Sequence, residues 1–226
     1  MLRAVIFDFD GVITDSEILH FRAFNQALAK HGIEITTKDY YKDYLGLTDI
    51  DLLNLLADKG LLRVDAQEIA NLAEQKKQVF KKLAKTEGRI IEGVRSFLAM
   101  LKKNNIAMAI CSGALLPEIE LILEEARLRS YFKVIVSAEQ VKKGKPNPEG
   151  FLLALRKLNE KNHNPIASNQ CIVIEDAHWG LEAAKAAEMH TVAITNSYDA
   201  DQLTSAEKVI AHLSQLSITD LQELCN

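Results

Sequence analysis

Two carboxylates, Asp8 and Asp10, stand two residues apart at the end of the apolar run AVIF. Burying a charge costs free energy unless the charge is paired or bound to a metal. A second acidic pair, Glu175 and Asp176, follows the apolar run CIVI, and Lys145 lies in the segment KKGKPNPEG. Each of these residues alone has an ordinary explanation, as a solvated strand end, a helix cap or a surface lysine.

Together these residues indicate phosphoryl transfer. Four crowded carboxylates would repel one another, and their pKa values would rise unless a cation lay among them. Carboxylate oxygens suit Mg²⁺, which keeps several waters and binds phosphate. Lys145 offers a compact positive charge to a phosphoryl oxygen, and the hydroxyl of Ser112 offers a hydrogen bond. The phosphate-binding pattern GxxxxGK[ST] is absent, so we expect a side-chain nucleophile, and an Asp carboxylate can form an aspartyl-phosphate.

The elements that must position these side chains are predicted from hydrophobic pattern. Unbroken apolar, β-branched runs are typical of strands buried on both faces of a sheet. Helical patterns separate them, which predicts βαβ units and a parallel sheet. Ligands bind outside the carboxyl ends of such strands, where the polar residues above are found. The predicted strands are Ala4–Phe9, Ala107–Cys111, Val134–Val136, Cys171–Ile174, Thr191–Ile194 and Lys208–Ile210.

One stretch interrupts the alternation of strands and helices. Residues 17–87 show no convincing strand pattern, and helices are predicted at Glu17–Lys30, Asp49–Lys59 and Asp65–Lys85. We therefore expect a core made of residues 1–15 and 89–226, with a helical domain, residues 16–88, inserted into it. Two chain crossings between the domains make a natural hinge. The basic cluster Lys76, Lys77, Lys81 and Lys82 is expected to be a solvated helix face.

Bulk properties exclude several classes of protein. The net charge of −4 and the pI of about 5.9 give no basic footprint for nucleic acid. No apolar run approaches the roughly 20 residues of a membrane-spanning helix, and the N-terminus has no signal-peptide pattern. The three cysteines are far apart and form no CxxC pair. We expect a cytoplasmic protein with reduced thiols, no nucleic-acid or membrane partner, and by default a monomer.

Four short motifs of the sequence together match a known family. DFDGV at 8–12, CSG at 111–113, KGKPNPEGF at 143–151 and IEDAHWG at 174–180 come in one order along the chain. In these motifs the sequence resembles the haloacid dehalogenase superfamily of phosphatases and phosphomutases. The stretch DSEILHFRAF at 15–24 and the helical insertion are similar to the subgroup that contains β-phosphoglucomutase and many small-molecule phosphatases. The resemblance implies an α/β fold, a Rossmann-like parallel-sheet core with an inserted α-helical cap.

The resemblance also implies roles for individual residues. Asp8 would attack phosphorus, and Asp10 would protonate the leaving oxygen and later activate water. Ser112, Gly113 and Lys145 would hold the transferring phosphoryl group. The dehalogenases of the superfamily lack an acid at the second motif position, so Asp10 favours phosphate chemistry.

The same resemblance implies a metal site. Mg²⁺ would be held by Asp8, the backbone carbonyl of Asp10 and Asp176, with Glu175 beside it directly or through water. The expected substrate is a small phosphorylated metabolite such as a sugar phosphate.

The predicted cap bears on the choice between phosphatase and mutase. His20, Gly46 and Lys76 are its candidate substrate residues, although His20 could equally be a helix histidine of the polar face. In the mutase a cap arginine shortly after the matching glycine grips a second phosphate, but residues 48–51 read TDID here. An Asp near a phosphate dianion repels it, which favours a phosphatase. The alternatives are a β-phosphoglucomutase-type phosphomutase and a non-catalytic sugar-phosphate-binding protein.

Overall fold

The structure is a computed structural model that describes residues 1–45, 47–160 and 162–226. The chain divides into two compact units. Residues 1–15 and 89–226 form the first, which we call the core unit, and residues 16–88 form the second, which we call the helical unit.

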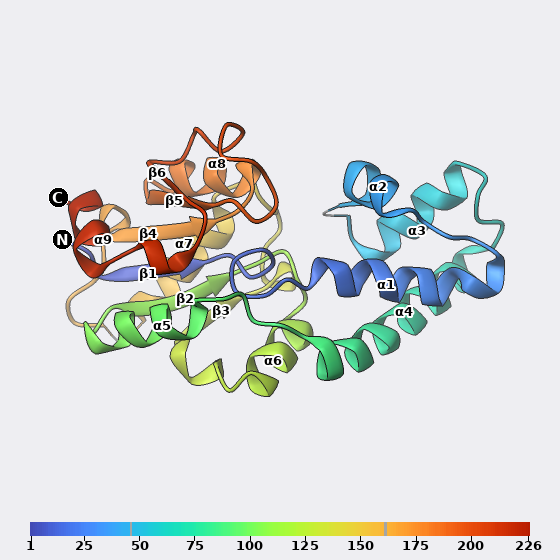
Figure 1. Ribbon diagram of the computed structural model, residues 1–226, viewed down its shortest axis with the longest axis horizontal. Coiled ribbons are helices and arrows are strands. Elements are labelled where there is room, and N and C mark those ends of the chain that lie inside the picture. Colours follow the sequence, from blue (N-terminus) through green and yellow to red (C-terminus); the bar gives the residue numbers. More distant parts are fainter. Residues whose placement is uncertain (46, 161) are drawn as a thin grey trace. The chain divides into compact units, whose positions relative to one another are not determined.

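The core unit is built on a parallel sheet. Its described strands are β1 (Ala4–Phe7), β2 (Ala107–Cys111), β3 (Val134–Val136), β4 (Cys171–Glu175), β5 (His190–Ile194) and β6 (Lys208–Ile210). They lie in the order β3-β2-β1-β4-β5-β6, and every neighbouring pair is parallel (Figure 1). The predicted Rossmann-like α/β fold with a helical insertion is confirmed.

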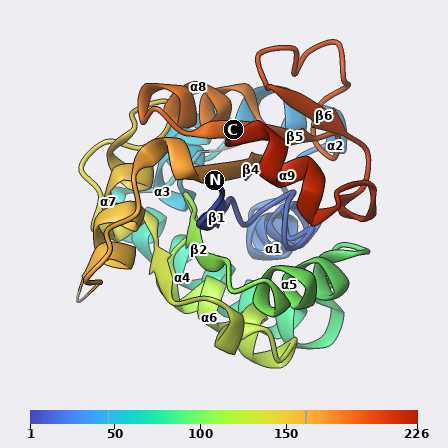
Figure 2. The ribbon, with the colours of Figure 1, turned by 90° about the vertical axis from the view of Figure 1, so that its left-hand side faces the viewer.

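Helices cover both faces of this sheet. They are α5 (Val94–Lys103), α6 (Leu116–Glu125), α7 (Glu149–Asn159), α8 (His178–Ala186) and α9 (Ile218–Leu224). Successive strand residues point to opposite faces: Ala4 and Ile6 belong to the cluster that contains the buried side of α7 and α8. Phe7 points the other way, edge-on to Phe97 of α5 with ring centroids 6.1 Å apart. Figure 2 shows α7 and α8 on one side of the sheet and α5 on the other.

Strand β1 ends earlier than its apolar pattern predicts. The carbonyl of Phe9 accepts hydrogen bonds from the N–H groups of Ile13 (2.8 Å) and Thr14 (3.1 Å), so the chain has left the strand and turned. The predicted strand over Ala4–Phe9 therefore stops at Phe7. A pattern of apolar residues does not distinguish a buried strand from the buried turn that follows it.

Strand register places the ends of three strands at one level. Phe7 pairs with Ile110 of β2 and with Ile174 of β4. Along the chain, Asp8 follows Phe7 and Glu175 follows Ile174. The N–H of Asp8 donates to the carbonyl of Ile174 at 2.9 Å. Because the strand order reverses at β1, this is the edge of an open parallel sheet at which ligands bind.

The helical unit has α1 (Glu17–Leu28), α2 (Thr37–Asp39), α3 (Asp49–Asp58) and α4 (Ala66–Glu87). Thr48 caps α3 by accepting from the N–H of Asp51 at 3.2 Å, and Asp65 caps α4 by accepting from the N–H of Glu68 at 2.9 Å. Leucines of α3 and α4 pack with Phe24 of α1 in the core of this unit. Among the described helices, none is both long and apolar enough to cross a membrane.

Lys76 contradicts the expected solvated face of α4. Its side chain is 1% exposed, whereas Lys82 is exposed. Lys76 lies one turn from Leu72 and one turn from Phe80, both buried, so helix geometry places it on the apolar stripe. Partners from other helices satisfy its charge: the ammonium donates to Asp49 Oδ1 of α3 at 2.6 Å and contacts Nδ1 of His20 of α1 at 2.7 Å.

Candidate active site

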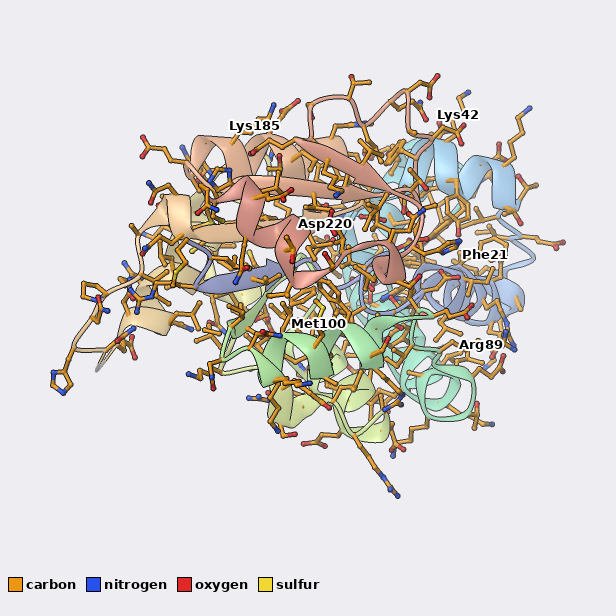
Figure 3. All side chains as sticks on the ribbon, turned by 60° about the vertical axis from the view of Figure 1, so that its left-hand side comes forward. Phe21, Lys42, Arg89, Met100, Lys185 and Asp220 are labelled. Atoms are coloured by element: carbon orange, nitrogen blue, oxygen red, sulfur yellow. The ribbon has the colours of Figure 1, made fainter. Side chains whose placement is uncertain are left out.

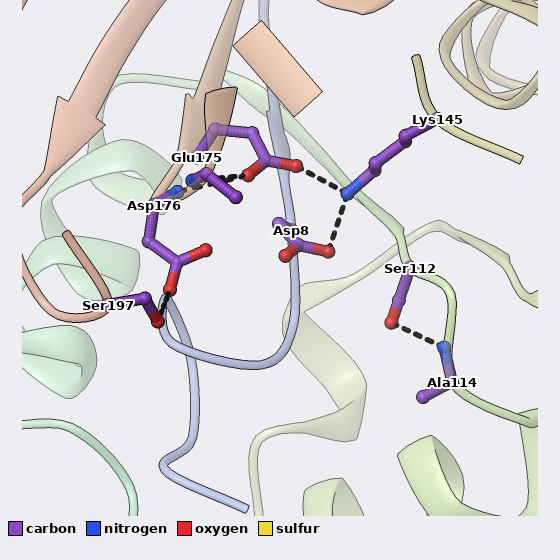
Figure 4. A network of polar contacts seen from close by, with 8 residues as sticks. Asp8, Ser112, Ala114, Lys145, Glu175, Asp176 and Ser197 are labelled. Carbon is purple, nitrogen blue, oxygen red and sulfur yellow. Dashed lines mark hydrogen bonds and ion pairs between the residues drawn. The ribbon is translucent and has the colours of Figure 1, made fainter. Parts of the chain in front are cut away.

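Lys145 connects two carboxylates at the carboxyl end of the sheet (Figure 4). Its ammonium donates to Asp8 Oδ1 at 2.7 Å and makes a short contact with Glu175 Oε1. Burial alone would lower the pKa of Lys145, but the charges of Asp8 and Glu175 hold that pKa above its ordinary value. The lysine is therefore a fixed cation beside the Asp8 carboxylate.

Three carboxylates form a cluster that fits a divalent cation. One carboxylate oxygen each from Asp8, Glu175 and Asp176 lies within 4.8 Å of the others. Burial first, and then the negative charge of Asp8, raise the pKa of Glu175 and of Asp176. A divalent cation among them would remove this repulsion, and oxygen donors of this kind are the ligands that Mg²⁺ prefers.

Glu175 is held more tightly than its neighbours. It is fully buried, and while Oε1 contacts Lys145, Oε2 accepts from the N–H groups of Asp176 (3.0 Å) and Ala177 (3.1 Å). Gly180 of α8 packs directly against it, since a Cβ at that position would lie 1.9 Å from Oε1. Both oxygens of Glu175 thus have protein donors, which suits a residue that orients its neighbours.

Ser112 lies at the end of β2, and Gly113 follows it on the surface. The N–H of Ser112 donates to the carbonyl of Val136 at 2.9 Å, which continues the ladder with β3. Its hydroxyl oxygen accepts from the N–H of Ala114 at 2.9 Å. The hydroxyl can therefore present its own hydrogen to a ligand.

Asp10 lies in the turn after β1, where its backbone forms a bridge with Thr14. Gly11 follows with φ of +75°, a conformation that favours glycine. The residue also needs to be glycine because of space: a Cβ there would lie 1.7 Å from Asp176 Oδ2. The turn that carries Asp10 therefore packs on the carboxylate of Asp176.

Two contacts to this site come from residues that the sequence analysis did not single out. After β5, Ser197 donates a short hydrogen bond from Oγ to Asp176 Oδ2, and Asn196 Nδ2 donates to the carbonyl of Gly11 at 2.6 Å. The signal was available, because both residues follow a predicted strand at the same edge as the acids. The expectation that ligands bind outside the carboxyl ends of parallel strands, applied to the fifth predicted strand, would have found them.

The three residues predicted for the cap belong to the helical unit. Gly46 lies outside the described residues. His20 and Lys76 contact each other, and because an ammonium can only donate, Nδ1 of His20 is the acceptor and the ring is neutral. Burial and the charge of Lys76 both lower the pKa of His20 well below its ordinary value. The alternative that the sequence left open, a histidine on the polar face of its helix, does not hold, since the His20 ring stacks on Phe80 with centroids 4.1 Å apart.

The chain is similar in sequence to a family of known proteins. The family model described as haloacid dehalogenase-like hydrolase matches residues 5–194. A phosphorylated carbohydrates phosphatase of Thermotoga maritima is 32% identical over 194 residues, 84% of each chain. A β-phosphoglucomutase of Bacillus subtilis is 28% identical over 98% of this chain and 95% of its own.

A solved structure agrees with these sequence matches. The β-phosphoglucomutase of Clostridium difficile superposes with a TM-score of 0.82 and 29% identity, over 100% of this chain and 98% of that one. The resemblance drawn from the motifs is thereby confirmed, and so is the expectation that the protein is an enzyme. The chain belongs to the haloacid dehalogenase-like hydrolase family.

Proposed function

We propose that this enzyme is a Mg²⁺-dependent phosphatase that hydrolyses a small phosphomonoester, such as a sugar phosphate, through an aspartyl-phosphate. The observation that carries the proposal is the convergence of Asp8, Lys145, Glu175 and Asp176 where the strand order reverses. The phosphatase relatives, including the Thermotoga maritima enzyme, support the same reaction class.

The proposed chemistry has two steps. The Asp8 carboxylate attacks phosphorus, the bond between phosphorus and the ester oxygen breaks, and Asp10 gives its proton to that oxygen. In the second step Asp10 takes a proton from water, the water oxygen attacks phosphorus, and the bond to Asp8 breaks to release inorganic phosphate. Lys145 and the Ser112 hydroxyl would hold the phosphoryl oxygens throughout, which leaves positioning and charge neutralisation as their task.

The residues that would hold Mg²⁺ are Asp8, Asp176 and the backbone carbonyl of Asp10. Glu175 would act beside the ion through water, since Lys145 and two backbone N–H groups already contact its oxygens. When bound, Mg²⁺ supplies positive charge to the oxygens of the transferring group.

The pairing of Lys76 in the helical unit supports a phosphatase over a mutase. A mutase must bind a second phosphate, which calls for unpaired positive charge. The buried ammonium of Lys76 is instead paired with Asp49 at 2.6 Å, so the pair carries no net charge. We therefore infer a substrate with one phosphate.

The test is release of inorganic phosphate from a panel of sugar phosphates, phosphoglycolate and nucleotides, with Mg²⁺ and with EDTA. We expect turnover of at least one sugar phosphate, its loss in EDTA, and its loss in Asp8→Asn. Asp201→Asn, an equivalent change at an exposed position of the core unit, should leave activity intact. Phosphate release by Asp8→Asn would contradict the covalent mechanism.

The mutase alternative makes a separate prediction. It requires activation by a sugar bisphosphate and conversion of β-glucose 1-phosphate to glucose 6-phosphate with little free phosphate, which ³¹P NMR distinguishes. That result would overturn the phosphatase proposal while leaving the roles of Asp8 and Asp10 in place.

A further inference from the structure

The loop that follows β5 touches the candidate site at two points. Ser197 Oγ donates to Asp176 Oδ2, and Asn196 Nδ2 donates to the carbonyl of Gly11 at 2.6 Å. Asp176 is a proposed metal ligand, and Gly11 adjoins the carbonyl of another, Asp10. One short segment therefore contacts one proposed metal ligand and the residue next to another.

These contacts separate the two oxygens of Asp176. Oδ2 accepts from Ser197 and lies against Gly11, where a Cβ would approach it to 1.7 Å. That oxygen is enclosed on two sides, which leaves Oδ1 to face a metal. We propose that Ser197 and Asn196 are positioning residues that fix the Asp176 carboxylate and the Gly11 turn for metal binding. The inference rests on the proposed Mg²⁺ site.

The loop is itself anchored, as a positioning element must be. The ring of Tyr198 packs on His178 with centroids 4.4 Å apart and on Trp179 at 5.8 Å, and both partners belong to α8, which begins directly after the acidic pair. On the other side, the N–H of Thr195 donates to the carbonyl of Ile210 at the end of β6, at 3.0 Å. The aromatic ring contacts and the backbone hydrogen bond restrict the freedom of the loop that carries Ser197, which suits a residue that positions a metal ligand.

The consequence is measurable as metal affinity. Groups that hydrogen-bond to a metal ligand typically contribute 10–100-fold to metal binding. We expect Ser197→Ala to weaken Mn²⁺ binding about 10-fold or more, measured by electron paramagnetic resonance of free Mn²⁺ in titrations of the full chain. Ser197→Thr keeps the hydroxyl and should restore affinity. Asn196→Ala, which acts only through Gly11, should cause a smaller loss.

Ser217 offers a matched control in the same unit. Its hydroxyl also donates to an aspartate, Asp220 (labelled in Figure 3), at the N-terminus of α9. Ser217→Ala therefore removes a hydrogen bond of the same kind away from the site, and Mn²⁺ affinity should not change. The melting temperature of the metal-free protein, measured for every variant, separates lost positioning from lost folding.

Three outcomes would overturn the inference. Wild-type Mn²⁺ affinity in Ser197→Ala would show that the hydrogen bond does not position the carboxylate. Equal weakening in Ser197→Ala and Ser197→Thr would show that the hydroxyl is not responsible. A wild-type chain that does not bind Mn²⁺ would overturn the proposed metal site and this inference with it, whereas metal binding without phosphatase activity would overturn only the proposed function.

Discussion

At the scale of single residues, Lys145 determines the electrostatics of the site. Its side chain is 13% exposed, and its ammonium contacts the carboxylates of Asp8 and Glu175, which would otherwise repel each other. The same ammonium is proposed to hold a phosphoryl oxygen. One side chain therefore offsets the repulsion between two carboxylates and would also neutralise the charge of the substrate.

Replacing Lys145 with Met should affect both roles. Removing one partner of a buried ion pair leaves an uncompensated charge, so we expect the free energy of unfolding of the metal-free core unit to fall by roughly 3 kcal/mol. Turnover should fall about 100-fold or more, the typical effect of removing one group that stabilises transition-state charge. Urea denaturation and phosphate release check the two effects, and Lys185→Met, on the exposed side of α8, is the control that should change neither.

The residues of the candidate site were predictable to different degrees. Asp8 and Ser112 directly follow strands and Glu175 ends one, and residue type with position at a strand end is enough to bring such residues together in a parallel sheet. Lys145 comes from a loop several residues after the third strand, so the sequence predicts its edge of the sheet but not its contact with both Asp8 and Glu175. The hydrogen bond from Ser197 to Asp176 depends on where a loop turns, which hydrophobic pattern does not encode.

At the scale of elements, α1, α3 and α4 are joined by a polar cluster of the half-buried His20 and Asp49 with the buried Lys76. The Lys76 ammonium also lies 4.7 Å from the ring centroid of Phe24 and 5.4 Å from that of Phe80. A charge in this environment is stable only while its partner is present. The cluster therefore makes the packing of three helices depend on one ion pair.

Asp49→Ala tests this dependence. Since it leaves the Lys76 ammonium buried without its carboxylate partner, we expect the helical unit to lose roughly 3 kcal/mol of stability. Asp43→Ala removes an exposed pair with Lys59 in the same unit, where both side chains are more than a third exposed, and should cost much less stability because solvent screens the pair. Urea denaturation followed by circular dichroism compares them. Equal losses would mean that burial of Lys76 adds nothing to the pair.

His20 gives the helical unit a pH dependence. Its pKa in the folded state is well below the ordinary 6.5, so between these two values the unfolded chain binds a proton that the folded chain does not. The free energy of unfolding should therefore decrease as pH falls below about 6.5, by at most about 1.4 kcal/mol per pH unit, and be unaffected by His20 above it.

Unfolding at pH 5.0, 6.0 and 7.5 measures this slope. His20→Asn keeps a hydrogen-bond acceptor without the titration and should flatten the dependence, while His163→Asn, at an exposed position of the core unit, should not. Parallel curves for the wild type and His20→Asn would contradict the assignment.

The elements themselves were largely predictable because their patterns are local. The α1, α3 and α4 boundaries lie within two residues of the predicted ones at each end, and the capping residues Thr48 and Asp65 precede α3 and α4 as capping preferences require. Periodicity assigns a face to a helix, but it does not say that Asp49 and His20 from other helices will satisfy a lysine on the apolar stripe. That is why the expected solvated position of Lys76 was wrong.

At the scale of the whole molecule, Mg²⁺ should stabilise one unit selectively. The proposed ligands all belong to the core unit, and Mg²⁺ at 100 times its Kd would raise the free energy of unfolding by about 2.7 kcal/mol. Trp179, the single tryptophan of the chain, lies in α8 of the core unit, so its fluorescence reports unfolding of that unit. We expect Mg²⁺ to shift the fluorescence transition upward, EDTA to reverse the shift, and Asp176→Asn to show none.

Within the core unit the two chain segments that lead to and from residues 16–88 are bonded to each other. The N–H of Ile91 donates to the carbonyl of Ile13 at 3.0 Å, and the Thr14 hydroxyl donates to the carbonyl of Arg89 at 2.8 Å. Because hydrogen bonds within the core unit hold these two ends together, the core unit can accept an inserted sequence at this point. Over evolutionary time, a lineage could lengthen, shorten or exchange the insert, and so diversify its substrates, without changing the proposed catalytic residues Asp8 and Lys145.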